Sequence, residues 1–165
     1  MERDVQVFQA ARSWGWLSLL VLAIVSVMAT LPGIFSGSVI VALLVLPLPV
    51  FFLLMLFWYP TIRYELSPDK LVMRFGPWRR QVDVAEIKSV SRRDFTPSPF
   101  SFLLLPGFAM FYVFFTDVNY VRMCSTRAIN NVTFIEATSD RRYGISPKDP
   151  DEFETLLRGY MAAQR

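Results

Sequence analysis

The chain has 165 residues, a formal net charge of +3, one cysteine and no histidine. A single cysteine, Cys124, excludes an internal disulfide, and without histidine the chain lacks the commonest general base and the commonest transition-metal ligand. The sequence also contains no phosphate-cradling glycine motif and no nucleophile elbow. We therefore expect a protein that is not an enzyme, with no catalytic residues, no metal site and no cofactor.

The first third of the chain is apolar. Between Arg12 and Arg63 no side chain is charged, and turn-forming residues at positions 32–38 split this run in two. Each half, residues 14–31 and 39–58, is about long enough to cross a bilayer core, which takes roughly 20 apolar residues. A signal peptide is the alternative for the first half, but its end is a poor match to a cleavage site. We predict a transmembrane helical hairpin in residues 1–60 and one cytoplasmic domain in residues 61–165.

Basic residues indicate the orientation of this hairpin. Arg3 and Arg12 precede the first apolar stretch, five lysines and arginines follow the second within residues 63–80, and the connecting turn has none. Because positively charged flanks stay on the cytoplasmic side of a membrane, both termini should be cytoplasmic.

Two features of the apolar stretches concern packing. Small residues, among them Ser26 and Thr30, recur at helical spacing and favour packing of the hairpin on itself, with dimerisation through the same face as the alternative. Pro47 and Pro49 lie near the middle of the second stretch, where they remove backbone donors. We expect a structural kink in the membrane span at these prolines. No charged residue accompanies them, which argues against an ion path.

From residue 61 the pattern changes to short alternating segments separated by turns, which is typical of an antiparallel sheet. Ile62, Tyr64 and Leu66 alternate with Arg63 and Glu65. Further strands are expected at residues 71–75, 78–84, 87–93, 108–116, 120–125, 132–137 and 142–145.

A helix should close the chain. Asp149 is a suitable N-cap, Pro150 fits the first helical position, and Glu152 completes a capping box. The apolar residues between Phe153 and Tyr160 then fall on one face of the helix, and this face must pack on the sheet.

The sequence YGISPKDP at residues 143–150, followed by Phe153 and Leu157, gives the chain a recognisable resemblance. Residues 60–160 resemble the bacterial pleckstrin-homology-like (PH-like) membrane proteins, whose members often carry an N-terminal hairpin. The resemblance implies an α+β protein, with a PH-like antiparallel β-barrel or sandwich capped by a C-terminal α-helix, and a non-catalytic role. It does not imply a phosphoinositide site, because the corresponding loop at residues 67–70 holds one lysine beside an acid.

Two groups of residues are candidates for contact with lipid or a partner. The arginine pairs Arg79-Arg80 and Arg141-Arg142 could form a lipid-facing patch, or could be solvated or paired internally. The apolar loop at residues 96–107, with Leu103, Leu104 and Leu105, could dip into the bilayer or cover the barrel. A third membrane span over residues 95–116 would contain three prolines and place basic residues outside, so we prefer the loop.

Taken together, these patterns predict an interaction module of the bacterial inner membrane, multi-pass, that binds lipid, a peptide or a membrane protein at the cytoplasmic face. The expected partners are the bilayer and either a protein partner or a second copy of the chain, and not nucleic acid. The alternative is a small accessory subunit of a membrane transporter or envelope complex.

Overall fold

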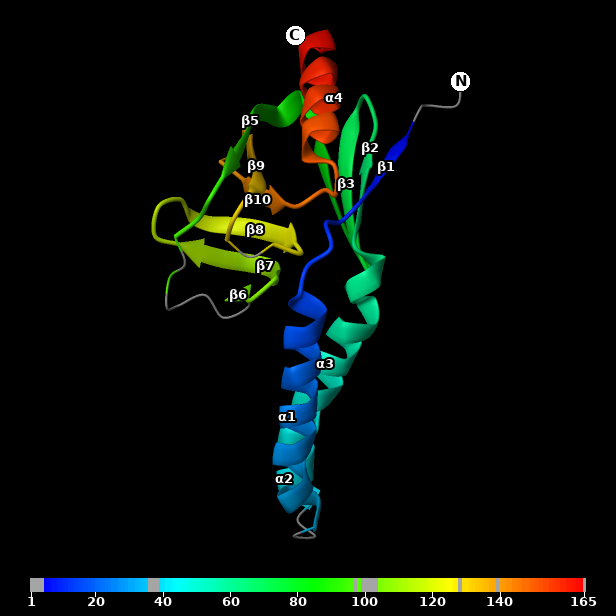
Figure 1. The fold of residues 1–165 in the computed structure, drawn as a ribbon, viewed down its shortest axis with the longest axis vertical. Helices are drawn as coiled ribbons and strands as arrows, with labels where there is room; N and C mark the ends of the chain where they lie inside the picture. Colours follow the sequence, from blue (N-terminus) through cyan, green and yellow to red (C-terminus); the bar gives the residue numbers. More distant parts are fainter. Residues whose placement is uncertain are drawn as a thin grey trace.

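The computed structural model describes residues 5–35, 39–96, 98, 104–127, 129–138 and 140–164. Three helical segments form an elongated stalk: α1 (Gly15–Phe35), α2 (Val39–Val45) and α3 (Pro47–Trp58). A short 3₁₀ turn, η1 (Tyr59–Thr61), leads from α3 into a domain of two β-sheets. The last helix, α4 (Pro150–Ala163), lies on this domain at the end away from the stalk (Figure 1).

The first sheet has the strand order β1-β2-β3-β4 and is antiparallel throughout. Its strands are β1 (Gln6–Gln9), β2 (Arg63–Leu66), β3 (Lys70–Phe75) and β4 (Trp78–Asp83). A second 3₁₀ turn, η2 (Val84–Glu86), leads to the second sheet, which has the order β5-β9-β10-β8-β7-β6. Its strands are β5 (Ile87–Arg93), β6 (Leu104–Leu105), β7 (Phe108–Phe115), β8 (Asn119–Ser125), β9 (Val132–Ala137) and β10 (Arg142–Ile145). Every strand that the sequence predicts is present, within one residue of its expected ends.

The expectation of an antiparallel β-barrel or sandwich is confirmed in part, because the domain is built of two sheets but differs from the expectation in two respects. β10 pairs in parallel with β8, with Tyr143 opposite Arg122, so the second sheet is mixed. The barrel is also not closed, since no strand pair joins the two sheets among the described residues. Alternation predicts which residues form a strand but not which distant strand they pair with, because pairing depends on the whole chain. The architecture is a sandwich of two β-sheets with a C-terminal helix.

The second apolar stretch is divided into two helices close to the expected prolines, while the kink in a membrane span stays a prediction. α2 ends at Val45 and α3 begins at Pro47, so Pro47 and Pro49 occupy the first turn of α3, where a missing backbone donor costs least. α1 continues beyond its expected end at residue 31 and includes Pro32 close to its C-terminus.

The stalk also packs on itself as the sequence indicates. α1 contacts both α2 and α3, and its buried residues are Gly15, Leu19, Ala23, Ser26 and Thr30. The hydroxyl groups of Ser26 and Thr30 donate to backbone carbonyl oxygens three residues earlier in α1, at 2.8 and 2.6 Å. The polar groups of this face are therefore satisfied within the helix, and the small residues allow close approach.

Most of the stalk surface is apolar and exposed. α1, with 21 residues, and the stretch Val39–Thr61, with 23, are long and apolar enough to cross a membrane, by length and composition. Only 22% and 12% of their most apolar windows are buried, whereas a core helix of a soluble protein would be mostly buried. These helices indicate membrane association. The crossing itself, the orientation and the division of the chain at residue 60 stay predictions.

The segment before α1 is part of the β-sheet, which the sequence analysis did not predict. β1 pairs with β2 in the register Gln6 to Leu66 and Gln9 to Arg63. Phe8 on β1 is buried and contacts Phe153 of α4 edge to face, with ring centroids 5.2 Å apart. The chain therefore enters the domain, leaves it through the stalk and returns to pair with its own beginning.

A smaller core cluster, which includes Phe95, Val113 and Phe134, packs on the second sheet. The main core cluster lies between the two sheets and beneath α4. Tyr64 is fully buried there; its hydroxyl donates to the carbonyl oxygen of Cys124 at 2.7 Å and accepts from the backbone N–H of Ser146 at 3.2 Å. α4 buries Phe153 and Leu157, as its sequence pattern predicts. Asp149 is the N-cap residue, but its side chain makes no capping hydrogen bond, so that part of the prediction is wrong.

Candidate binding site at the junction of stalk and sheets

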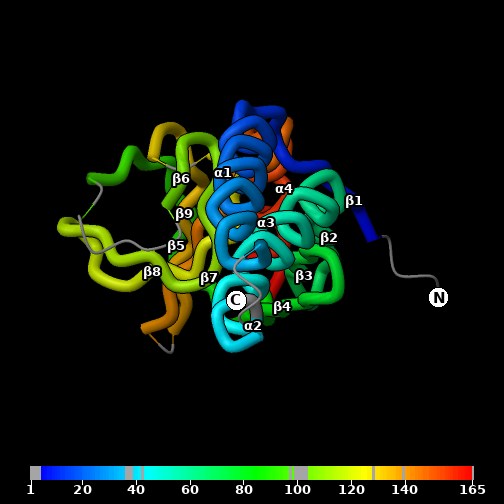
Figure 2. The backbone as a smooth tube through the Cα atoms, turned by 90° about the horizontal axis from the view of Figure 1, so that it is seen from below, coloured from blue at the N-terminus to red at the C-terminus, as the bar shows by residue number. Residues whose placement is uncertain are grey.

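An aromatic cluster fixes the end of the stalk against the domain. Trp58 at the end of α3 meets Trp78 edge to face, with ring centroids 5.0 Å apart, and Trp78 stacks on Phe75 at 5.6 Å. The Trp58 ring also covers Gly76, whose φ of +52° favours glycine and where a Cβ atom would overlap the indole. Seen from below in Figure 2, α1 and α3 lie side by side, with β1–β3 on the α3 side and the second sheet on the other.

Polar contacts fix the start of α1 in the same region. The Ser13 hydroxyl donates to the carbonyl oxygen of Gly107 at 2.6 Å and lies 2.9 Å from the Tyr59 hydroxyl. Two residues before Ser13, the carbonyl oxygen of Ala11 accepts a hydrogen bond from the Thr126 hydroxyl at 2.6 Å. Gly15 sits so close to Gly107 that a Cβ atom on Gly15 would overlap the Gly107 carbonyl group. The position of the stalk relative to the sheets is thus determined by specific contacts from both helices.

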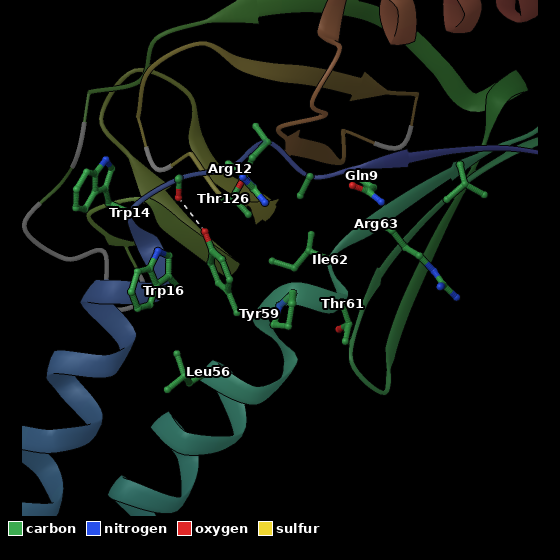
Figure 3. Close-up of a pocket in the computed structure, with 15 residues that line it drawn as sticks. Gln9, Arg12, Trp14, Trp16, Leu56, Tyr59, Thr61, Ile62, Arg63 and Thr126 are labelled. Carbon is green, nitrogen blue, oxygen red and sulfur yellow. Dashed lines mark hydrogen bonds between the residues drawn. The ribbon is translucent and has the colours of Figure 1, made fainter.

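A large open pocket lies between these two attachments, with a volume of about 1150 Å³. Arg12 and Arg63 lie on its domain side, and Leu56 lies on the stalk side (Figure 3). Trp14 and Trp16, with 76% and 48% of their surface exposed, line the pocket at the start of α1. The pocket is amphipathic: both of its cations lie on the domain side, where apolar residues such as Val7 and Ile62 also line it, and Leu56 and Trp16 line it on the stalk side.

A row of arginines continues this basic surface across the first sheet. Gln9, Arg63, Arg74 and Arg79 are successive partners in the registers of β1, β2, β3 and β4. Glu65 forms ion pairs with Arg63 at 3.2 Å and with Arg74 at 2.8 Å, and so offsets part of the charge. Arg79 and Arg12 have no ion-pair partner among the described residues. We name Arg12, Arg63, Arg74 and Arg79 the basic rim.

Comparison with known protein families matches residues 62–161 to the bacterial PH domain. The match covers more than half of the chain, from the residue before β2 into α4. The chain belongs to the bacterial PH domain family. PH domains are generally non-catalytic interaction modules that contact lipids or proteins. No curated protein and no solved structure is significantly similar to the chain.

This bacterial PH domain separates the two arginine pairs that the sequence suggested as contact residues. Arg79 and Arg80 are at the start of β4, next to Trp78 and the end of the stalk. Arg142 donates to the carbonyl oxygen of Val118, in the turn between β7 and β8, at 2.6 Å. Arg80 contacts β7 at Tyr112, in the middle of the strand, so the two pairs lie at different positions along β7.

Arg142 is also paired within the PH domain. Its guanidinium group lies 3.4 Å from Asp140 and 3.8 Å from Glu136. Arg142 therefore forms ion pairs within the domain, which was one of the alternatives expected for this pair, while the neighbouring Arg141 is exposed. Lipid contact by either arginine pair stays a prediction.

The apolar loop of the PH domain is ordered by the fold where the structure describes it. Leu104 and Leu105 form β6, pair with β7, and are half-buried against the two core clusters. Leu103 lies outside the described residues. The strands β6 and β7 rule out a third helical span over the described part of residues 95–116. The loop end at Gly107 reaches the start of α1, so this part of the loop lies beside the stalk.

Sequence reasoning missed the junction pocket of the PH domain. Arg12 and Arg63 were used only as flanks of the apolar stretches, although these flanks are separated by a hairpin and so must return close together. That closure, together with Trp14 and Trp16 beside Arg12, was the available signal. The contribution of β1 to the site could not be recognised, because its four residues carry no strong alternating pattern.

Proposed function

We propose that this protein is a membrane-anchored interaction module that binds an anionic phospholipid in the junction pocket. In this proposal α1 and the α2–α3 segment cross the membrane, and the PH domain rests on its cytoplasmic face. The headgroup lies against Arg12 and Arg63, and the acyl chains lie along Leu56 and the stalk. The protein acts by binding and not by catalysis.

The amphipathic polarity of the pocket is the observation that carries this proposal. Arg12, which has no ion-pair partner among the described residues, and Arg63, which shares Glu65 with Arg74, line one open space together with apolar side chains at the domain end of two apolar helices. Tryptophan is favoured at the headgroup level of membranes, and Trp14 and Trp16 mark that level at the start of α1. Arginine forms paired hydrogen bonds with phosphate oxygens, which suits a phospholipid headgroup.

The test uses the full-length protein in nanodiscs, because β1 precedes the stalk and a fragment starting at residue 60 would lose it. Native mass spectrometry would measure the lipids that stay bound from a mixture of zwitterionic and anionic phospholipids. We expect wild-type protein to retain anionic lipid selectively. The double variant Arg12→Gln with Arg63→Gln should lose this selectivity.

The control variant carries Arg93→Gln and Arg141→Gln, which removes the same charge at exposed positions that do not line the pocket. It should retain anionic lipid as the wild type does. Equal loss in both variants would contradict a pocket and leave net charge as the cause. Retention of a protein and of no selected lipid would favour an accessory subunit of a membrane complex.

A further inference from the structure

Alternation along β4 directs its two arginines to opposite faces of the first sheet. Arg79 belongs to the outer row of the basic rim, whereas Arg80 is opposite Met73 of β3, which is in turn opposite Tyr64 of β2. Met73 and Tyr64 are both buried in the core between the sheets. The side chain of Arg80 therefore faces the space between the two sheets, at their open edge.

A second arginine faces the same space from the other sheet. Arg122 on β8 is two residues before Cys124, and side chains two apart lie on the same face of a strand. Cys124 belongs to the core cluster between the sheets, so Arg122 also faces inward. In the register of the second sheet Arg122 is opposite Tyr112 of β7.

Tyr112 holds the two arginines together. The guanidinium carbon of Arg80 lies 5.6 Å from the centroid of the Tyr112 ring, and that of Arg122 lies 5.1 Å from the same centroid. The carboxylates of Glu65 and Glu136 pair with other arginines, and no ion pair to Arg80 or Arg122 is found in the described part of the chain. Two like charges thus share one aromatic ring without a counter-ion, an arrangement that an anion would stabilise.

The arginines border a small cavity, which we name the inter-sheet cleft. Its volume is about 90 Å³, and Arg80, Arg122 and Arg79 line it together with apolar side chains such as Met73 and Met110. Cys124 also lines the cleft, and burial raises the pKa of its thiol to about 12, so the thiol is neutral and supplies no negative charge. The space suits one small group and is too small for a whole lipid headgroup with its chains.

We propose that the inter-sheet cleft binds a single phosphate monoester group between Arg80 and Arg122. A phosphate monoester carries a charge of about −1.5 to −2 at neutral pH, which matches two guanidinium groups better than a carboxylate does. Its oxygens also accept the paired hydrogen bonds that arginine offers. Tyr112 is a positioning residue in this site, because it orients both arginines.

The phosphate can belong to a soluble compound or to a lipid headgroup. Trp78, which also lines the cleft, contacts Trp58 at the end of the stalk, so the cleft opens close to the expected membrane surface. The inter-sheet cleft and the junction pocket share no lining residue. Substitutions in one site therefore leave the lining of the other unchanged, and the two proposals can be tested independently.

The experiment measures the thermal unfolding midpoint of the full-length protein in zwitterionic nanodiscs at fixed ionic strength. One arm adds inorganic phosphate in place of chloride. The other places phosphatidic acid, whose phosphate is a monoester, in the nanodisc and uses protein that carries Arg12→Gln and Arg63→Gln throughout, so that the junction pocket does not contribute. Binding to the folded state raises the midpoint. We expect a rise in at least one arm, and a weaker rise at pH 5, where the phosphate loses its second charge. A rise with phosphatidic acid alone assigns the phosphate to a lipid.

The double variant Arg80→Gln with Arg122→Gln should require roughly tenfold more phosphate or phosphatidic acid for the same rise, or more. Without added phosphate it should be at least as stable as wild type, since it lacks the repulsion of two like charges; a purely structural role predicts a lower midpoint instead. The control variant Arg93→Gln with Arg141→Gln should respond as wild type, and Arg12→Gln with Arg63→Gln should respond as wild type to inorganic phosphate. No rise in either arm, or an equal rise in the Arg80 and Arg122 variant, would overturn the proposal.

Discussion

At the scale of single residues, Tyr64 connects the two sheets. Its hydroxyl is the partner of two buried backbone groups, the carbonyl of Cys124 and the N–H of Ser146, both in the second sheet or directly after it. Burial also raises the pKa of this phenol, so Tyr64 stays neutral in the folded protein. A buried backbone group without a partner costs free energy, and Tyr64 satisfies two of them at once.

We predict that Tyr64→Phe lowers the free energy of unfolding by about 1 to 3 kcal/mol, because the ring still fills its space while the two backbone groups lose their partner. Denaturant unfolding of the full-length protein in detergent would measure the change. Tyr120→Phe is the matched control, since Tyr120 is 66% exposed and should change stability little. Equal stability of the Tyr64 variant and wild type would show that water or another group replaces the hydroxyl.

The buried thiol and phenol also predict how stability depends on alkaline pH. Burial raises the pKa of Cys124 from 9.0 to about 12 and raises that of Tyr64 above 10.0. The unfolded state therefore releases these protons at lower pH than the folded state. The free energy of unfolding should fall above pH 9, by about 1.4 kcal/mol per pH unit for each group past its unfolded pKa.

The measurement is denaturant unfolding at fixed ionic strength between pH 8 and pH 11. Cys124→Ala should remove the part of the decrease that begins at pH 9 and leave the part that begins near pH 10. A stability that is flat from pH 8 to pH 11 in wild type would mean that Cys124 and Tyr64 are accessible to solvent. Cys124→Ala also leaves a small cavity in the core, which lowers the free energy of unfolding at every pH. The comparison with wild type therefore uses the slope of the free energy of unfolding against pH and not its absolute value.

The sequence predicts which face of a strand a side chain takes, but not which distant side chain it meets. Alternation along a strand predicts that the side chains of Arg79 and Arg80 point to opposite faces of the first sheet. The proximity of Arg80 to Arg122 was not predictable, because it depends on how β4 and β8 of different sheets face each other. Local patterns carry no information on that distance.

At the scale of elements, local patterns predicted the strands and the final helix well. β5, β9 and β10 have the expected bounds, and α4 begins at Pro150 as its capping sequence indicates. β1 was missed because its four residues do not alternate, and β6 was missed because it has only two residues; both strands form through their pairing partners. The parallel pairing of β10 with β8 was missed for the same reason, since it joins segments that alternate in the ordinary way.

The start of α1 docks on the turn between β6 and β7 through the close approach of Gly15 to Gly107. A Cβ atom on Gly15 would overlap the carbonyl group of Gly107, and both groups are backbone, so neither can turn aside. Gly15→Ala should therefore displace α1 and lower the thermal unfolding midpoint, although alanine is the better helix former by about 1 kcal/mol.

Gly159→Ala in α4 is the control for this variant. No atom lies within 4 Å of the position that its Cβ would take, so only the gain in helix propensity remains and the midpoint should rise. Opposite signs for the two substitutions would confirm that the close approach at Gly15 is real. A rise for Gly15→Ala would show that α1 is not held against Gly107.

At the scale of the whole molecule, pairing of β1 with β2 constrains the topology. β1 precedes the stalk and β2 follows it, yet Gln6 is opposite Leu66 in one sheet. Both ends of the stalk must therefore be on the same side of any membrane that the stalk crosses, so the number of crossings is even. The basic rim is at this end, and lysine- and arginine-rich flanks stay in the cytoplasm.

We therefore predict that Val39, at the start of α2, faces the outside of the cell membrane and Ala163, at the end of α4, faces the cytoplasm. A membrane-impermeant thiol reagent should label Val39→Cys in intact cells and should label Ala163→Cys only after lysis. Native Cys124 gives little background, because it is buried and its thiol is neutral at ordinary pH. Labelling of Ala163→Cys alone in intact cells would reverse the orientation, and labelling of both would mean that the stalk does not cross. Either result would mean that Trp14 and Trp16 do not lie among the lipid headgroups of the cytoplasmic face, and it would contradict the proposed lipid site there.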